Sequence, residues 1–167
     1  SDLDGTLRPV TPDAMVGAAP AGAIQSSVND VLRWVDVQLK RGKLAEGRLF
    51  SEAQAEQMWT PHVFMPNRKP AAELAGTRTN FQAYALGWVV SEYRGELMVS
   101  HTGGLPGMVT RVTLLPERNL GVVVLTNQES GAAFQAVTMT ALDLALGGAQ
   151  TDWVAAYLAV RKRQVEE

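Results

Sequence analysis

Four short apolar runs follow one another between residues 86 and 126, and only turn-length segments separate them. The runs span residues 86–92, 97–101, 108–115 and 120–126. Connections this short join strands that run in opposite directions, so the pattern predicts an antiparallel β-sheet. The last run contains Val122-Val123-Val124-Leu125, which is apolar on both faces. We therefore expect it to form a central strand that is covered on both sides.

Helical patterns precede and follow these runs. Apolar residues at positions 28, 31, 32, 35 and 39 form one stripe of an amphipathic helix, and Ser27 is placed to cap its N-terminus. Ser51 and Gln54 form a capping pair that starts a shorter helix. The stretch 131–146 is apolar almost all round, which predicts a buried helix, and 152–164 predicts a modestly amphipathic one. Helices beside an antiparallel sheet indicate an α+β fold of the α/β sandwich type, in which helices flank the sheet.

Two segments have the composition of loops. Residues 1–20 are rich in Asp, Gly and Pro, and residues 60–80 contain three prolines with little apolar periodicity. We expect both to form loops, the second of them a long surface loop. His62 lies in this second segment, where we expect an ordinary surface histidine.

The composition narrows the classes of function. The net charge of −2 gives no reason to expect nucleic acid or an anionic membrane surface as a partner. The chain has no cysteine and only two histidines, so we expect no disulfide, no metal site and no cofactor. No apolar run is long enough to span a membrane, so no membrane span is expected.

One polar and glycine-rich segment, His101-Thr102-Gly103-Gly104, follows the second apolar run directly. We expect it to lie where that strand ends. Two residues without a Cβ let a ligand approach the backbone closely and bond to its amide N–H groups. Such a site suits a carbonyl or a carboxylate. The alternative is a strand end followed by a glycine-rich turn that binds nothing.

Four segments occur in a specific order: residues 19–30, 84–88, 101–107 and 120–127. Their order and spacing resemble the C-terminal half of the serine beta-lactamase and penicillin-binding protein superfamily, in its class C-like and esterase- or D-aminopeptidase-like branch. His101-Thr102-Gly103 matches the third active-site motif, written Lys-Thr-Gly in the best-known members. The resemblance covers residues 1–148 and implies the C-terminal portion of a beta-lactamase-like fold. Residues 149–167 would then form a C-terminal helix that leads toward a further domain.

Two other motifs of that family are absent from this chain. No serine has a lysine three residues on, so Ser-x-x-Lys, which holds the family's nucleophile, is missing. Tyr-x-Asn is also missing, and Ser27-Val28-Asn29 matches its Ser-x-Asn variant only at a helix-capping position. We therefore expect a fragment that carries one wall of an active site without the nucleophile. The missing N-terminal part of the same protein, or a second copy of this chain, is the expected protein partner.

The resemblance implies a role for each residue of the third motif. Gly104 corresponds to a backbone donor of the oxyanion hole, and His101, Thr102 and Gly103 correspond to substrate-binding residues. His101 replaces a lysine, and a histidine carries its charge only below a pKa that is normally about 6.5. The implied activity is hydrolysis of a small amide, ester or β-lactam substrate through an acyl-enzyme. A binding or regulatory module that kept the fold and lost catalysis is the alternative. The compartment stays open between periplasmic, secreted and cytoplasmic.

Overall fold

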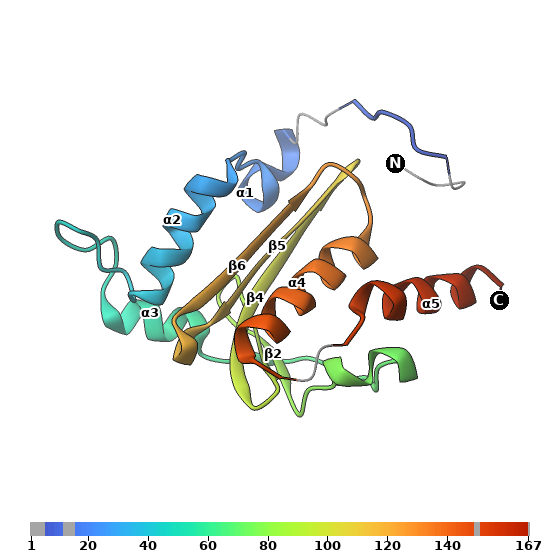
Figure 1. The fold of residues 1–167 in the computed structure, drawn as a ribbon. Coiled ribbons are helices and arrows are strands. Elements are labelled where there is room, and N and C mark those ends of the chain that lie inside the picture. The colour runs from blue at the N-terminus through green and yellow to red at the C-terminus, as the bar shows by residue number, and fades with distance from the viewer. Residues whose placement is uncertain (1–5, 12–15, 149–150, 167) are drawn as a thin grey trace.

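The computed structural model of the chain describes residues 6–11, 16–148 and 151–166. Its centre is a six-stranded antiparallel sheet in which each strand pairs with the next one along the chain (Figure 1). The strands are β1 (Val63–Phe64), β2 (Gln82–Tyr84), β3 (Val89–Tyr93), β4 (Glu96–Leu105), β5 (Met108–Leu115) and β6 (Leu120–Thr126). The antiparallel sheet expected from the apolar runs is thus confirmed, with short strands β1 and β2 added at one side.

Helices cover both faces of this sheet. Figure 1 shows α2 on one face, and α4 with α5 beside it on the other. The helices are α1 (Ala19–Gly22), α2 (Val28–Leu39), α3 (Glu52–Trp59), α4 (Gly131–Leu146) and α5 (Trp153–Glu166), with 3₁₀ segments η1 (Val16–Ala18), η2 (Ala72–Thr77) and η3 (Pro116–Arg118). This is the expected α+β arrangement.

Successive side chains of a strand point to opposite faces, and the sheet therefore builds two separate apolar cores. On the α2 face, Val99 of β4 and Leu114 of β5 pack with Val35 of the helix. On the α4 face, Met98 and Leu115, the neighbours of those two residues in the chain, pack with α4 and α5. Each face of β4 and β5 thus has its own set of neighbours.

The expected helix starts are confirmed. The Ser27 hydroxyl accepts a hydrogen bond from the backbone N–H of Asp30 at 3.2 Å and caps α2. Ser51 and Gln54 form a reciprocal capping box at the start of α3. In both cases a side chain satisfies backbone donors that the first helical turn leaves without a partner, so a short sequence signature specifies the helix start.

Two burial expectations are wrong. Strand β6 lies at the edge of the sheet, whereas the apolar run Val122–Leu125 had predicted a central strand. Helices on both faces explain why this run is apolar on both sides, and an apolar run does not report whether a strand has one neighbour or two. Helix α4 also is not buried all round, because Val137 and Leu144 are 53% and 60% exposed.

The loop expectations hold only in part. Within residues 1–20, positions 1–5 and 12–15 lie outside the described residues, and η1 and α1 occupy the region that follows. Residues 60–80 contain strand β1 and the 3₁₀ turn η2. Here β1 forms because it pairs with β2, a long-range contact that the local sequence does not encode.

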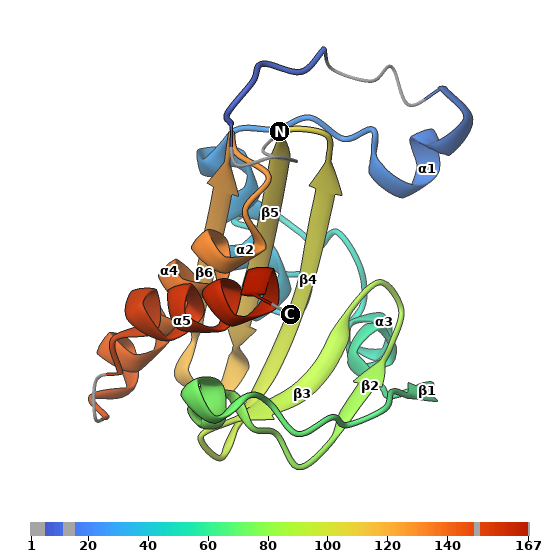
Figure 2. The same cartoon turned by 90° about the vertical axis from the view of Figure 1, so that its right-hand side faces the viewer.

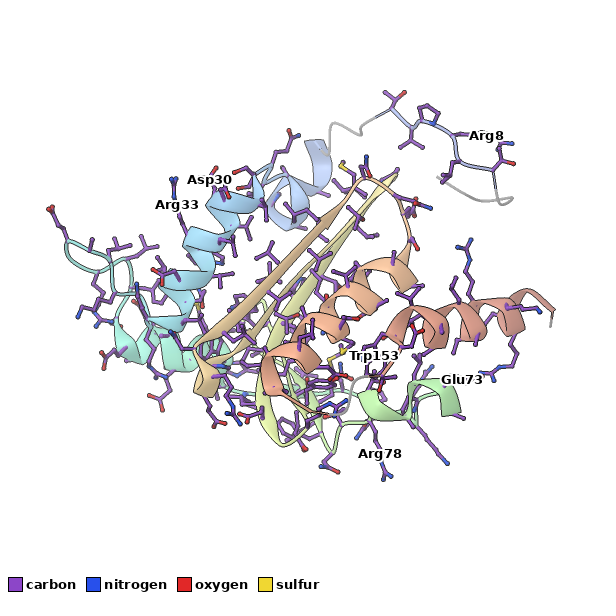
Figure 3. All side chains as sticks on the ribbon, in the orientation of Figure 1. Arg8, Asp30, Arg33, Glu73, Arg78 and Trp153 are labelled. Carbon is purple, nitrogen blue, oxygen red and sulfur yellow. The ribbon has the colours of Figure 1, made fainter. Side chains whose placement is uncertain are left out.

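A buried carboxylate fixes α5 to the rest of the fold. Asp143 of α4 is 2% exposed and accepts hydrogen bonds from the Tyr93 hydroxyl at 2.5 Å, from Arg94 at 2.9 Å and from the Trp153 indole at 2.9 Å. Figure 3 shows Trp153 at the start of α5, with Glu73 of η2 nearby. Burial, and then the bond to Asp143, raise the pKa of Tyr93 to about 12. The network joins β3, α4 and α5, so the C-terminal helix packs as part of this unit.

Candidate functional site

The polar and glycine-rich segment lies inside a strand rather than at its end. Strand β4 continues through His101 to Leu105, and Gly104 pairs with Val109 of β5. The turn comes later, at Pro106 and Gly107. Glycine has a low strand propensity, so the local sequence predicts an end at His101, but the pairing with β5 extends the strand. The expectation that the strand ends at this segment is therefore wrong, because the strand continues to Leu105.

One edge of this segment carries no neighbouring strand. Strand β3 pairs with β4 only as far as Ser100, which lies opposite Val89. Figure 2 shows the remaining part of β4 with β5 on one side alone. Among the residues that the structure describes, no strand pairs with the other edge of 101–105, and residues 101–104 are exposed. Backbone N–H and C=O groups at such an edge are available to a ligand.

His101 has a side-chain partner in Tyr84, the last residue of β2. The Tyr84 hydroxyl lies 3.0 Å from Nε2 of His101, and the two rings meet edge to face with centroids 5.9 Å apart. Both side chains are exposed, so the pair is accessible from solvent. The sequence placed Tyr84 at the start of segment 84–88, one of the four ordered segments, but assigned it no role. Its spacing of 17 residues from His101 gave no signal of contact.

The two glycines differ in what surrounds them. A Cβ added at Gly103 would lie 2.7 Å from the Thr110 hydroxyl oxygen, so a side chain there would displace Thr110. A Cβ added at Gly104 would meet only a methyl group of Val109, at 4.0 Å. Packing against β5 therefore favours glycine at 103, whereas the space over Gly104 is open. An open position is what a backbone donor to a bound ligand needs.

The structure does not bring all four expected site residues to one face. Alternation along β4 directs the side chains of His101 and Thr102 to opposite sides of the sheet. Thr102 lies opposite Arg111 of β5 and shares the α4 face with it. His101 is directed to the α2 face, and its ring meets the Tyr84 hydroxyl next to the point where pairing of β3 with β4 stops. A substrate contact of the Thr102 side chain stays a prediction.

The turn between β4 and β5 is anchored by the loop that follows β6 at the same end of the sheet. The backbone N–H of Gly107 donates to the Glu129 carboxylate at 3.2 Å, and Gly107 adopts a φ of 79°. Glu129 lies between β6 and α4, so this bond ties the end of the exposed β4 segment to the strand pair beside it. Sequence reasoning did not identify Glu129.

The family model of beta-lactamases matches residues 2–146 of this chain. The chain belongs to the beta-lactamase family. The resemblance seen in the order of the motifs is therefore confirmed, and so is the fold, an antiparallel sheet with helices on both faces. The exposed β4 segment, His101 and Tyr84 thus belong to a beta-lactamase-family domain.

Two similar proteins are named as hydrolases. The beta-lactamase-family chain is 30% identical over 107 residues to an unguisins hydrolase of Aspergillus campestris and 29% identical over 116 residues to an unguisins hydrolase of Aspergillus violaceofuscus. Each alignment covers 64% of this chain but only 18% and 19% of the two relatives. The chain thus spans less than a fifth of the length of the curated relatives it matches.

A solved structure supports the same assignment. The octameric penicillin-binding protein homologue from Pyrococcus abyssi matches with a TM-score of 0.60 and 26% sequence identity, over 74% of this chain and 25% of that protein.

Within the described residues, no helix has the length and apolarity needed to cross a bilayer.

Proposed function

We propose that this chain supplies one wall of the active site of a serine hydrolase that cleaves amide, ester or β-lactam bonds through an acyl-enzyme. The observation that carries the proposal is the exposed, unpaired edge of β4 at residues 101–105, with the His101–Tyr84 pair beside it. Family membership and the hydrolase names of the relatives support the reaction class.

The backbone N–H of Gly104 is the proposed oxyanion donor. When a serine attacks a carbonyl, the carbonyl oxygen gains negative charge, and a preorganised N–H donor stabilises that charge. The open space over Gly104 leaves room for the carbonyl oxygen, and pairing of β4 with β5 holds the backbone in place before substrate arrives. The second donor in this class of mechanism belongs to the nucleophilic residue itself.

The His101 side chain is the proposed contact for a polar or anionic group of the substrate. Its Nε2 is engaged by the Tyr84 hydroxyl, so Nδ1 is the ring nitrogen left for another partner. Tyr84 can donate to Nε2 or accept from it, and either bond restricts rotation of the imidazole. Gly103 has no side chain, so it lets the substrate come close to the backbone of the same strand.

The nucleophile is proposed to come from outside this chain. Ser-x-x-Lys is absent from it, and β6 offers an edge without a strand partner in the described residues. We infer that the remaining part of the same protein, or a second copy of the chain, pairs beside β6. The domain boundary near residue 148 and the lead into a further domain also belong to this proposal.

A noncatalytic binding module is the second candidate. It is favoured by one observation, the absence of both Ser-x-x-Lys and Tyr-x-Asn from the 167 residues. The two candidates differ in whether a serine of the assembled protein becomes acylated, because only the hydrolase forms a covalent bond with substrate.

Covalent labelling tests the proposal. The protein that contains this chain and the chain by itself are each incubated with a fluorophosphonate and with a fluorescent penicillin, and intact masses are recorded. We expect one adduct on a serine outside these 167 residues and none on the chain alone. An adduct on a serine within the chain would refute the assignment of the nucleophile, and no adduct on the larger protein would favour the binding module.

A further inference from the structure

Arg111 of β5 is a buried cation on the face of the sheet opposite His101. It is 7% exposed, and its guanidinium donates to the hydroxyl of Thr113 at 2.9 Å, to the side-chain oxygen of Gln135 and to the hydroxyl of Ser100 at 3.4 Å. All three acceptors are uncharged. In the part of the chain that the structure describes, no carboxylate lies within ion-pair distance of this guanidinium.

A buried charge without a counter-charge is costly. Removal of a guanidinium from water is compensated when a carboxylate or phosphate pairs with it, and neutral hydrogen-bond acceptors compensate less well. Arg94 illustrates the usual solution, because it forms an ion pair with Asp143 at 2.9 Å. For Arg111, burial lowers the pKa of the guanidinium, which is the expected sign for a cation that lacks an anionic partner.

A cavity gives access to this guanidinium. Its volume is about 360 Å³, and its lining includes Arg111, Gln135 of α4, Tyr157 of α5 and Arg68 from the loop before η2. Arg68 is exposed and adds a second positive charge at the lining. Helices α4 and α5 cover this face (Figure 1), and the side chain of His101 lies on the opposite face of the sheet.

Glu92 also belongs to the lining, and its carboxylate accepts a hydrogen bond from Asn80 at 2.7 Å. Side chains alternate along β3, so the Glu92 carboxylate is directed to the face opposite Ser91 and Arg111. The arginines therefore set the charge at this side of the cavity.

We propose that this cavity binds a small organic molecule through one anionic group, a carboxylate or a phosphate ester, which pairs with Arg111. The planar guanidinium still has N–H groups beyond the three that hydrogen-bond to Thr113, Gln135 and Ser100, and such a fork suits a carboxylate. Arg68 adds attraction at the exposed side, and Tyr157 supplies an aromatic wall for the uncharged part of the ligand. The cavity lies on the face opposite the His101 side chain, and among the expected site residues only the side chain of Thr102 shares its face.

Binding of simple anions tests this site. The protein, in whatever assembled form it purifies, is titrated with acetate, with methyl phosphate and with sodium chloride at matched ionic strength, and affinity is read by calorimetry and by the shift of the melting temperature. We expect acetate or methyl phosphate to bind and to raise the melting temperature beyond sodium chloride. Acetate alone would assign a carboxylate, and methyl phosphate alone a phosphate ester.

Three variants decide where the anion sits. Arg111→Gln should weaken binding at least about tenfold, because a charge-assisted pair is lost. Arg68→Gln, at an exposed position, should weaken binding by a smaller factor of about two to five. Arg33→Gln, an exposed arginine on α2, should leave affinity unchanged. If Arg111→Gln does not fold, Arg68→Gln still decides.

Equal responses of the wild type to acetate, methyl phosphate and chloride would overturn the proposal, as would anion affinity that Arg68→Gln and Arg111→Gln both leave unchanged. Because none of these measurements uses hydrolysis, their outcome does not depend on whether the proposed hydrolase activity exists.

Discussion

The hydroxyl of Tyr84 and Nε2 of His101 lie 3.0 Å apart, and this hydrogen bond links β2 to the exposed part of β4. Neither residue is held by burial, so the bond itself restricts the imidazole. Tyr84→Phe removes the hydroxyl and keeps the ring contact with His101.

We expect Tyr84→Phe to lower kcat/KM of the active protein by about 2- to 10-fold, the usual worth of one hydrogen bond. The free energy of unfolding should change little, because the pair is exposed. Nitrogen NMR of the imidazole supplies a direct readout, since the tautomer populations of His101 should shift in the variant. An unchanged spectrum together with unchanged kinetics would remove Tyr84 from the site.

Gly104→Val tests the oxyanion donor. The space over Gly104 accepts a Cβ, so the fold should survive, but a branched side chain there would obstruct the approach of a carbonyl oxygen to the amide. We expect turnover to fall by about 10²-fold, as for loss of one oxyanion donor. Met108→Val places a branched side chain on the paired strand close by and should keep near-normal turnover. Normal turnover of a folded Gly104→Val protein would rule out the role.

The charge on His101 should make substrate affinity depend on pH. Histidine changes protonation near neutral pH, whereas lysine stays cationic there. If His101 pairs with a substrate carboxylate, affinity for carboxylate-bearing substrates should fall as pH rises through neutrality. In His101→Lys the same curve should be flatter. Identical pH profiles of KM for the two proteins would exclude the contact.

The sequence predicted the parts of the fold that depend on local signals. Ser27 and the Ser51–Gln54 pair specify helix starts within a few residues of chain, and the apolar runs before and after Gly103 specify strands. Positions that depend on distant partners were not predictable. The extension of β4 past His101 follows from pairing with β5, and the edge position of β6 depends on which strands exist beside it.

The candidate site was also predictable only where it depends on local sequence, and not where it depends on distant partners. The family resemblance singled out His101 and Gly104, but the contact of His101 with Tyr84 arises from the path of β2 and β3 between them. Arg111 gave no signal in the sequence, because a single arginine in a strand of alternating residues is indistinguishable from a surface arginine until the helices that cover it are known.

Stability should fall at alkaline pH through Tyr93. Its pKa is raised to about 12 by burial and by the hydrogen bond to Asp143, whereas an unfolded tyrosine ionises near pH 10. Below about pH 10 both states keep the proton and the contribution is complete; above it only the unfolded state ionises, so stability falls as pH approaches 12. The loss approaches about 1.4 kcal/mol per pH unit in this window.

Urea unfolding midpoints between about pH 9 and 12 measure this loss. Tyr93→Phe should be less stable at neutral pH, because Asp143 loses a donor, and should lose less with rising pH. Tyr84→Phe, at an exposed tyrosine, is the matched control and should keep the wild-type slope. Parallel slopes for Tyr93→Phe and wild type would contradict the assignment.

The edge of β6 should drive association of this chain when it is purified by itself. An unpaired strand edge offers backbone donors and acceptors to another strand, and exposed apolar side chains beside it add burial. Leu125 of β6 and Val137 of α4 are 39% and 53% exposed. We therefore expect light scattering to report dimers or larger species, or a complex with the remaining part of the same protein.

Leu125→Lys should shift the population toward monomer, because a charge at a strand edge opposes pairing, whereas Leu158→Lys on α5 should not. A dilute, monodisperse monomer that unfolds cooperatively would show that β6 needs no partner.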